Sequence, residues 1–276
     1  MASYLEFDFK ISPLQPASDI LIAELGALGF ESFVENKDGI SAYIPSKDWQ
    51  EHMLSDLGIL KNENFHFEFT SKEIPHENWN ATWEKNFTPI QIDERCTVRA
   101  PFHEMTDADY DIVISPKMSF GTGHHQTTYM MLQLLLEQDV TGKSVLDMGS
   151  GTGVLAILAA KKGAHLTEAI DIDHWCYLNG KENVALNGIK TIEVKEGGSE
   201  LLGHRKYDLI LANINRNILL VDIPVYAENM AENGQLLLSG FYQGDLPAIS
   251  KRCRECGLKL EKNLEKEDWV AAKYVF

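Results

Sequence analysis

Val145-Leu-Asp-Met-Gly-Ser-Gly-Thr-Gly153 is the stretch of this 276-residue chain that decides its fold. Residues of strand character lead into a glycine-rich turn, and the apolar run Val154–Ala160 that follows predicts a helix. Gly149, Gly151 and Gly153 carry no Cβ, so they allow a tight turn and the close approach of a ligand. The start of the helix presents free N–H groups. The stretch therefore predicts a ligand site between a strand and a helix.

The spacing of the glycines separates two classes of cofactor. A dinucleotide-binding turn has the pattern G-x-G-x-x-G, but here the third glycine comes one position early and Val154 stands in its place. The pattern D-x-G-x-G-x-G is instead typical of enzymes that bind S-adenosylmethionine, which carries a sulfonium and a carboxylate but no pyrophosphate. We expect that cofactor, and an NAD-linked oxidoreductase is the alternative from another enzyme class.

An acidic residue lies at the end of the next predicted strand. The sequence Thr167-Glu-Ala-Ile-Asp-Ile172 places Asp171 where an acid of a βαβ unit accepts hydrogen bonds from both ribose hydroxyls. Because S-adenosylmethionine and NAD both contain this ribose, Asp171 predicts a nucleoside ligand without choosing between them. Its alternative role is to cap the helix Trp175–Leu186, but Asp173 fits that N-cap position better.

Alternating strands and helices follow from residue 98 onward. Strands are expected at residues 144–148, 167–172, 190–194, 207–212 and 235–239, and helices at residues 153–162, 174–186, 217–230 and 246–256. This order predicts an α/β fold, a doubly wound and mostly parallel sheet with helices on both faces. The last two predicted strands, 258–264 and 269–276, are joined by a short acidic turn and predict an antiparallel C-terminal hairpin. Such an ending is typical of S-adenosylmethionine-dependent methyltransferases.

Two further segments contribute candidate site residues. The strand at 207–212 is followed by Asn213, a polar amide at the carboxyl edge of the sheet, where ligands of open α/β folds bind. Upstream, the glycine-broken loop at 119–128 leads into a helix. There, Thr127 and Thr128 either cap the helix or reach a ligand carboxylate, and capping is at least as well supported by the local sequence.

Metal and thiol chemistry are not predicted. His124 and His125 are neighbours whose side chains diverge, and no cluster of ligands with metal-binding spacing accompanies them. Cys253 and Cys256 have the spacing of a redox motif, but they lie late on a predicted helix and are expected to be ordinary reduced thiols. No residue stands out as an obligatory general base, so the catalytic residues are left unassigned.

Residues 1–70 predict a small α+β domain. Strands are expected around residues 5–11, 33–34, 40–44 and 65–69, with helices at 18–28 and 46–58, an order that is ferredoxin-like. This segment holds twelve acidic and four basic residues and no cofactor motif. We therefore expect a domain that recognises the substrate, because its negative charge would attract a basic protein surface.

Residues 71–95 are predicted to form a helical linker. Trp79, Trp83 and Phe87 recur at a spacing of four and would lie on one face of a helix, where they would pack on a neighbour. The catalytic domain is then expected to span residues 96–276.

Composition sets further limits. The net charge of −16 argues against a nucleic-acid surface, which would be basic. No apolar run approaches the ~20 residues of a membrane span, the first residues do not resemble a signal peptide, and four cysteines do not make a disulfide framework. We expect a cytoplasmic monomer that contacts neither nucleic acid nor membrane.

The motif order resembles the PrmA family, bacterial methyltransferases of ribosomal large-subunit protein eleven. The matching segments are Phe120-Gly-Thr-Gly with Thr127-Thr128, Leu146–Ile157, Ile170–Asp173, Glu182-Asn183, Asn187-Gly188 and Ala212–Ile214, with Trp79, Trp83 and Phe87–Pro89 resembling the linker and Glu265–Trp269 the closing hairpin. The resemblance covers residues 75–276, and residues 1–70 match in predicted topology only. Two departures, His125-Gln126 for the usual His-Pro and His174-Trp175 for a common proline, alter loop stiffness and leave any effect on substrate preference open.

The resemblance implies a reaction and a set of contacts. It places cofactor contacts on Thr128, Gly149, Asp171 and Asn213, and the glycine turn itself adds Gly151. It implies methyl transfer from S-adenosylmethionine to lysine amines, and an α-amino group, of a ribosomal large-subunit protein. The alternatives are a methyltransferase for another protein or a small-molecule amine, and a non-enzymatic protein that senses the cofactor.

Overall fold

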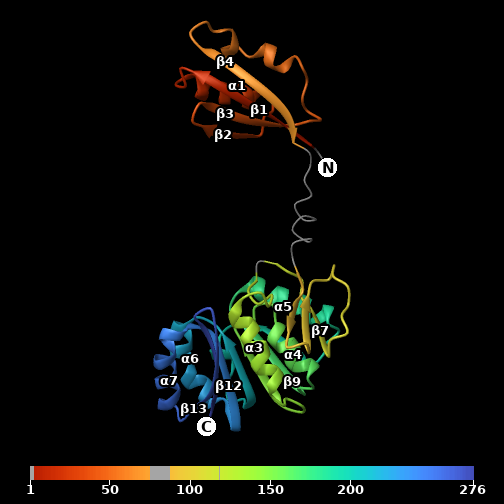
Figure 1. Cartoon of the computed structure of the whole chain (residues 1–276), viewed down its shortest axis with the longest axis vertical. Coiled ribbons are helices and arrows are strands. Elements are labelled where there is room, and N and C mark those ends of the chain that lie inside the picture. The colour runs from red at the N-terminus through yellow and green to blue at the C-terminus, as the bar shows by residue number, and fades with distance from the viewer. Residues whose placement is uncertain (1–2, 75–87, 118) are drawn as a thin grey trace. The chain divides into compact units, whose positions relative to one another are not determined.

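The computed structural model describes residues 3–74, 88–117 and 119–276. The chain divides into two compact units, Met1–Asn86 and Phe87–Phe276 (Figure 1). The aromatic stripe of the predicted linker lies outside the described residues. Strands β4 (His66–Ile74) and β5 (Ile90–Ile92) both enter the segment 71–95 that the sequence assigned to the linker.

The first unit is a four-stranded antiparallel sheet. Its strands pair in the order β2-β3-β1-β4. Side chains alternate between the two faces of β1, and Phe7, Phe9 and Ile11 are buried against a helix on one face. The opposite face of this sheet carries polar side chains, including Glu6 and Asp8 of β1. The elements are β1 Tyr4–Ser12, α1 Ala17–Ala27, β2 Ser32–Asn36 and β3 Gly39–Pro45, with β4 after them.

The second helix predicted for this unit, at 46–58, is wrong. The structure has two short 3-10 turns there, η1 at Met53–Asp56 and η2 at Ile59–Lys61. Leu57 and Ile59 are both buried, at 2% and 4% exposure. The backbone of Leu57 is extended (φ −71°, ψ 117°), which ends the first turn, and Ile59 N donates to Glu24 Oε2 of α1 at 3.1 Å. These packing and hydrogen-bond contacts keep the chain off the helical path.

The second unit is built on a seven-stranded sheet with the order β10-β9-β8-β11-β12-β14-β13. The first five strands are parallel, and the last two run antiparallel as a hairpin. The strands are β8 Ser144–Met148, β9 Leu166–Asp171, β10 Ile192–Glu196, β11 Tyr207–Asn213, β12 Met230–Tyr242, β13 Lys259–Lys266 and β14 Trp269–Val275. All were predicted within a few residues, although β12 is much longer than expected.

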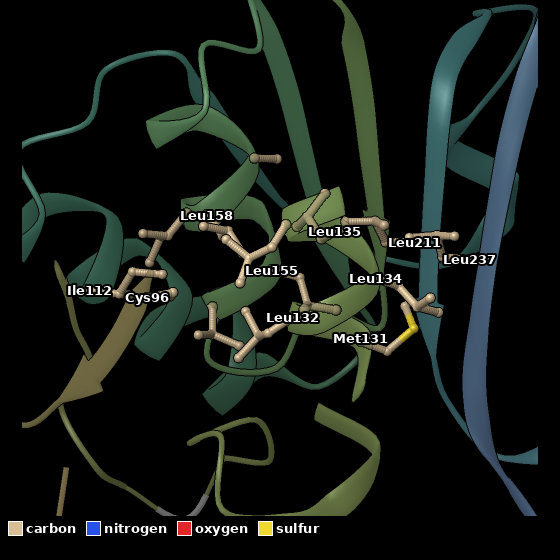
Figure 2. Close-up of a cluster of buried hydrophobic side chains, with 14 of the residues drawn as sticks. Cys96, Ile112, Met131, Leu132, Leu134, Leu135, Leu155, Leu158, Leu211 and Leu237 are labelled. Atoms are coloured by element: carbon tan, nitrogen blue, oxygen red, sulfur yellow. The ribbon is translucent and has the colours of Figure 1, made fainter. Parts of the chain in front are cut away.

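Helices cover both faces of this sheet. Successive residues of its central strands point to opposite sides, and the side chains on both sides are apolar, so both faces are buried under helices. One set of side chains packs against α3 (Gln126–Glu137) and α4 (Val154–Lys161), and Figure 2 shows Leu211 and Leu237 of this set directed toward α3. The other set packs against α6 (Arg216–Glu228) and α7 (Leu246–Glu255). The first set includes Val145, Leu209, Leu211 and Leu237, and the second includes Leu146, Ile210, Ala212 and Leu238.

A small three-stranded sheet, which the sequence did not predict, precedes the main one. It pairs β5, β6 (Cys96–Arg99) and β7 (Tyr110–Val113). Two asparagines hold the end of β7 and the residues after it. Asn183 lies in α5 (His174–Leu186), and Asn187 is the C-cap of that helix. Asn183 Oδ1 accepts from Ser115 N at 2.8 Å, and Asn187 exchanges hydrogen bonds with both backbone groups of Val113. These asparagines of the PrmA-like motif therefore have a structural role.

The topology places a crevice at the carboxyl ends of the central strands. From β8 the chain proceeds outward through β9 and β10, and it returns to the other side of β8 with β11 and β12. Ligands of open α/β sheets bind where the strand order reverses in this way, here between β8 and β11. No helix in the described part of the chain is long and apolar enough to cross a membrane.

Candidate functional site

A cavity of about 540 Å³ lies at this carboxyl edge, a volume in the usual range of small-molecule sites. Gly149, Gly151, Asp171 and Asn213, four of the five predicted site residues, line it. The fifth, Thr128, is 1% exposed and lies behind Asn213 instead of on the wall. The remaining lining residues come mainly from the segments 120–127, 172–176, 197–200, 214–222 and the start of β14.

The glycines of the turn are required by the protein's own packing. Gly149 and Gly151 have φ of +70° and +54°, in the left-handed region that favours glycine. A Cβ on Gly149 would lie 2.1 Å from Ile214 Cγ2, and one on Gly151 would lie 2.3 Å from the Phe120 carbonyl oxygen. The sequence predicted space for a ligand at these positions, whereas the nearest atoms belong to neighbouring segments of the chain.

The turn is tied to the upstream glycine loop. Thr152 donates from its backbone N to Phe120 O at 3.0 Å and from its hydroxyl to Gly121 O at 2.6 Å. This pairing joins two segments about thirty residues apart in sequence and fixes the backbone of Phe120 beside the cavity.

A buried carboxylate supports the helix that follows the turn. Asp147 is 1% exposed, and its Oδ2 accepts from Ala156 N, in the first turn of α4, at 3.1 Å. Burial raises the pKa of Asp147 to about 7, the hydrogen bond from Ala156 lowers it, and the nearby Asp171 charge raises it further. One of the helix N–H groups that the sequence left for a ligand is thus used inside the protein.

Asp171 is held rigidly at the end of β9. Its Oδ2 accepts from Gly151 N at 2.8 Å, and its Oδ1 accepts from Asp173 N at 2.9 Å. The prediction that Asp173 caps α5 is confirmed, because its side chain accepts from Cys176 N at 2.9 Å. That hydrogen bond lowers the pKa of Asp173. Since Asp173 caps the helix, the Asp171 carboxylate remains on the cavity wall.

Asn213 presents an unpaired acceptor next to the cavity. Its Nδ2 donates to Thr128 Oγ1 at 3.2 Å, which orients the amide. Its Oδ1 is buried and has no hydrogen-bond partner among the residues that the structure describes. A buried carbonyl oxygen without a donor is costly, so this atom is a place where a ligand N–H would be stabilised.

The capping role considered for Thr127 and Thr128 is wrong. The N-cap of α3 is His125, whose side chain accepts from Thr127 N at 3.3 Å. His125 Nδ1 also lies 2.8 Å from Thr127 Oγ1, and His124 Nε2 lies 3.1 Å from Thr88 O. The two histidines are therefore engaged in separate local hydrogen bonds.

Aromatic rings form one wall of the cavity. Ring centroids of Phe120 and His125 are 5.1 Å apart, those of His125 and Trp269 are 4.8 Å apart, and those of Trp269 and Tyr242 are 4.1 Å apart. Phe120, His125 and Trp269 line the cavity. Sequence reasoning missed this wall, because its rings come from separate segments of the second unit that no local pattern connects.

Comparisons with known proteins agree with this geometry. The family model described as "Ribosomal protein L11 methyltransferase (PrmA)" matches residues 19–275. Proteins named ribosomal protein L11 methyltransferase include one from Phocaeicola vulgatus, 45% identical with 99% of both chains covered, and one from Porphyromonas gingivalis, 45% identical with 98% of this chain and 97% of that chain covered.

A solved structure shows the same fold. The crystal structure of a ribosomal protein L11 methylase from Lactobacillus delbrueckii subsp. bulgaricus matches with a TM-score of 0.62 and 29% identity, covering 68% of this chain and 98% of that one. This likeness confirms the predicted α/β fold of the S-adenosylmethionine-dependent methyltransferase type, with its mostly parallel sheet.

Proposed function

The chain belongs to the ribosomal protein L11 methyltransferase (PrmA) family, and on this premise we propose that it transfers methyl groups from S-adenosylmethionine to amines of ribosomal protein L11. The acceptors are lysine side chains and an α-amino group. The observation that carries the proposal is the buried, unpaired Oδ1 of Asn213, which lies in the same cavity as the Asp171 carboxylate.

The residues of the cavity fit this cofactor. Asp171 has both oxygens fixed by backbone N–H groups and retains lone pairs for the two ribose hydroxyls. Gly149 and Gly151 lie on the same cavity wall, and the backbone N–H of Gly151 fixes the Asp171 carboxylate there. Cofactor-binding roles for Gly149, Gly151, Asp171 and Asn213 are therefore supported, and Thr128 acts by orienting Asn213. When bound, the cofactor supplies a methyl group already activated by a sulfonium, so positioning supplies most of the catalysis.

The acceptor amine must be neutral to react. Deprotonating a lysine of pKa ~10.4 at pH 7 costs about 4.6 kcal/mol, at 1.36 kcal/mol for each pH unit. An aromatic wall lowers the amine pKa by removing water, whereas a carboxylate beside the amine would raise it. Asn213 accepts an N–H of the amine without holding its proton through a charge, which is what this reaction needs.

The first unit is proposed to capture the substrate. Its strand order β2-β3-β1-β4, with all neighbours antiparallel, supports a ferredoxin-like domain in which 3-10 turns replace the second helix. Its acidic excess over residues 1–70 suits a basic protein surface. We further propose that the enzyme acts as a monomer in the cytoplasm, without nucleic acid, where its four free cysteines stay reduced.

The acceptor chemistry decides between this function and its alternatives. The full chain is incubated with S-adenosylmethionine carrying a labelled methyl group and with total ribosomal proteins, and every labelled product is identified by mass. We expect base-stable methyl groups on amines of ribosomal protein L11. Methyl esters, methylated nucleic acid or a methylated small molecule would refute the assignment, and calorimetry that finds NAD binding without S-adenosylmethionine binding would refute the cofactor.

A further inference from the structure

The cavity continues past Asp171 into a region that the proposed reaction does not explain. Ile172, the residue after the ribose acid, is 81% exposed, and Ile218 of α6 is 46% exposed, yet both line the cavity. Exposed branched side chains on a cavity wall gain stability when a flat apolar ring covers them. If Asp171 holds the ribose, the group next to it is the purine base of the cofactor.

The Asp222 carboxylate lies in this region of the cavity, and two hydrogen-bond donors orient it. Asp222 Oδ1 accepts from Ser199 Oγ at 3.2 Å, and Asp222 Oδ2 accepts from Tyr226 OH at 3.2 Å. Tyr226 is fully buried, and burial together with the Asp222 charge raises its pKa, so its hydroxyl keeps the proton that it donates. Asp222 is thus held in one orientation by the loop after β10 and by its own helix.

The other carboxylate nearby is occupied by its own loop. Glu200 also lines the cavity, but its Oε1 accepts from Gly198 N at 2.8 Å, and the residue is exposed. Asp222 is the half-buried carboxylate of the two, so its remaining lone pairs favour a ligand donor more strongly than those of an exposed group.

From this geometry we infer that Asp222 is a specificity-determining residue that accepts a hydrogen bond from the 6-amino group of the cofactor's adenine. A carboxylate is an acceptor only. Adenine offers an amino donor at its position 6, whereas a 6-oxo purine offers an acceptor there, which the carboxylate repels. The inference rests on the proposed function, since it takes S-adenosylmethionine as the ligand.

The test compares the affinities of S-adenosylhomocysteine and S-inosylhomocysteine by calorimetry, using the full chain. These ligands differ at purine position 6, amino against oxo, and at N1, which is an acceptor in adenine and carries a hydrogen in the 6-oxo base. The wild-type chain should bind the inosyl compound ~10–100-fold more weakly, as expected for a lost hydrogen bond to a charged group. In Asp222→Asn the amide can donate to the oxo group, so the ratio should fall to within about threefold.

Two controls keep the inference falsifiable. Glu200→Gln should retain the wild-type ratio of the two affinities, because the Glu200 carboxylate accepts a hydrogen bond from Gly198 N of its own loop. S-nebularinylhomocysteine, which has hydrogen at position 6, tests the wild-type chain without any mutation, and it should bind ~10-fold or more weaker than the adenosyl compound.

The outcomes separate this inference from the proposed function. If the wild-type chain binds S-adenosylhomocysteine but Asp222→Asn keeps the full discrimination, or weakens both ligands equally, Asp222 does not read the base. If the wild-type chain tolerates loss of the amino group in the nebularine compound, the inference also fails while the methyltransferase assignment stands. A wild-type chain that binds no S-adenosylhomocysteine overturns both.

Discussion

The two sheets of this protein bury their side chains in different ways. The sheet of the second unit has helices on both faces, so its central strands are mostly apolar, with a few buried polar residues such as Asp147 and Glu168, and its candidate site residues lie at the strand ends. The sheet of the first unit buries the Phe7, Phe9 and Ile11 side of β1 against α1, and its other face is polar. The difference is the basis of the division of roles that we propose. A sheet covered on both faces offers an edge cavity for a small molecule, and a sheet with a polar face offers a surface for a protein.

The largest effect is expected at the acceptor end of the cavity. Asn213→Ala removes the unpaired Oδ1 that we propose orients the amine, and loss of this positioning should lower kcat about 100-fold. Steady-state kinetics with ribosomal protein L11 measures this, and calorimetry with S-adenosylhomocysteine separates the loss of amine positioning from any loss of cofactor affinity. A variant with normal kcat would show that Asn213 does not position the amine.

A somewhat smaller effect is expected at the ribose. Asp171→Ala should weaken S-adenosylhomocysteine binding by roughly 1.5–3 kcal/mol, the range for hydrogen bonds to a charged group. Because Asp171 also holds the glycine turn through Gly151 N, the variant is compared on a second ligand, the 2′-deoxy analogue. The wild type should discriminate between the two ligands, and the variant should not. Equal discrimination in both proteins would place the ribose elsewhere.

The raised pKa of the buried Asp147 should make the stability of the second unit depend on pH. Its pKa rises from 3.8 in the unfolded chain to about 7 when buried, so the folded chain binds more protons over that interval. The contribution of Asp147 to stability is present below pH 4 and is lost as the pH rises through 7. Relative to Asp147→Asn, which does not titrate, the wild type should lose roughly 2–3 kcal/mol between pH 5 and 8.

Urea unfolding of the two proteins at pH 5 and pH 8 measures this difference. The asparagine can still accept from Ala156 N, so the comparison isolates the charge. A stability difference that does not change with pH would show that Asp147 has an ordinary pKa.

The smallest effect is expected on the polar face of the first sheet. Glu68 of β4 has a side chain that is 71% exposed, on the same face as Glu6 and Asp8. Glu68→Lys should raise KM for ribosomal protein L11 by about two- to fivefold, as for an exposed charge pair, and less at high salt. Glu232→Lys, an equal change at an exposed site of the second unit, is the matched control. Equal effects of the two changes on KM would mean that the net charge of the whole protein, and not the polar face of the first sheet, attracts the substrate.

The sequence could predict those residues of the site whose positions depend only on neighbouring residues in the chain. The turn Gly149–Gly153, Asp171 and the cap Asp173 belong to one strand–turn–helix–strand segment, where spacing alone carries the information. Thr128 was assigned to the cofactor by resemblance, and the structure places its hydroxyl on Asn213. The motif did not show that orienting role, which requires two segments to meet.

The features that sequence could not predict depend on distant contacts. Trp269 meets His125 only because the C-terminal hairpin packs beside the start of α3, where Gln126 and Glu267 are hydrogen-bonded. Asp222 and Ser199 lie on separate elements and are hydrogen-bonded to each other at the cavity wall. In the first unit, the segment 46–58 has apolar residues compatible with a helix, but the burial of Leu57 and the hydrogen bond from the following Ile59 N to Glu24 of α1 favour 3-10 turns.

The division of roles between the two sheets is tested most directly by removing the first unit. Because β4 extends to Ile74, the truncated chain should begin at residue 75, which leaves both buried clusters of the second unit intact. On one preparation, S-adenosylhomocysteine affinity and the rate of methyl transfer to ribosomal protein L11 are measured together with those of the full chain. We expect an affinity within a few-fold of the full chain and a loss of transfer of about 100-fold or more, because the substrate is no longer held near the cavity. Transfer at the rate of the full chain would contradict the division of roles.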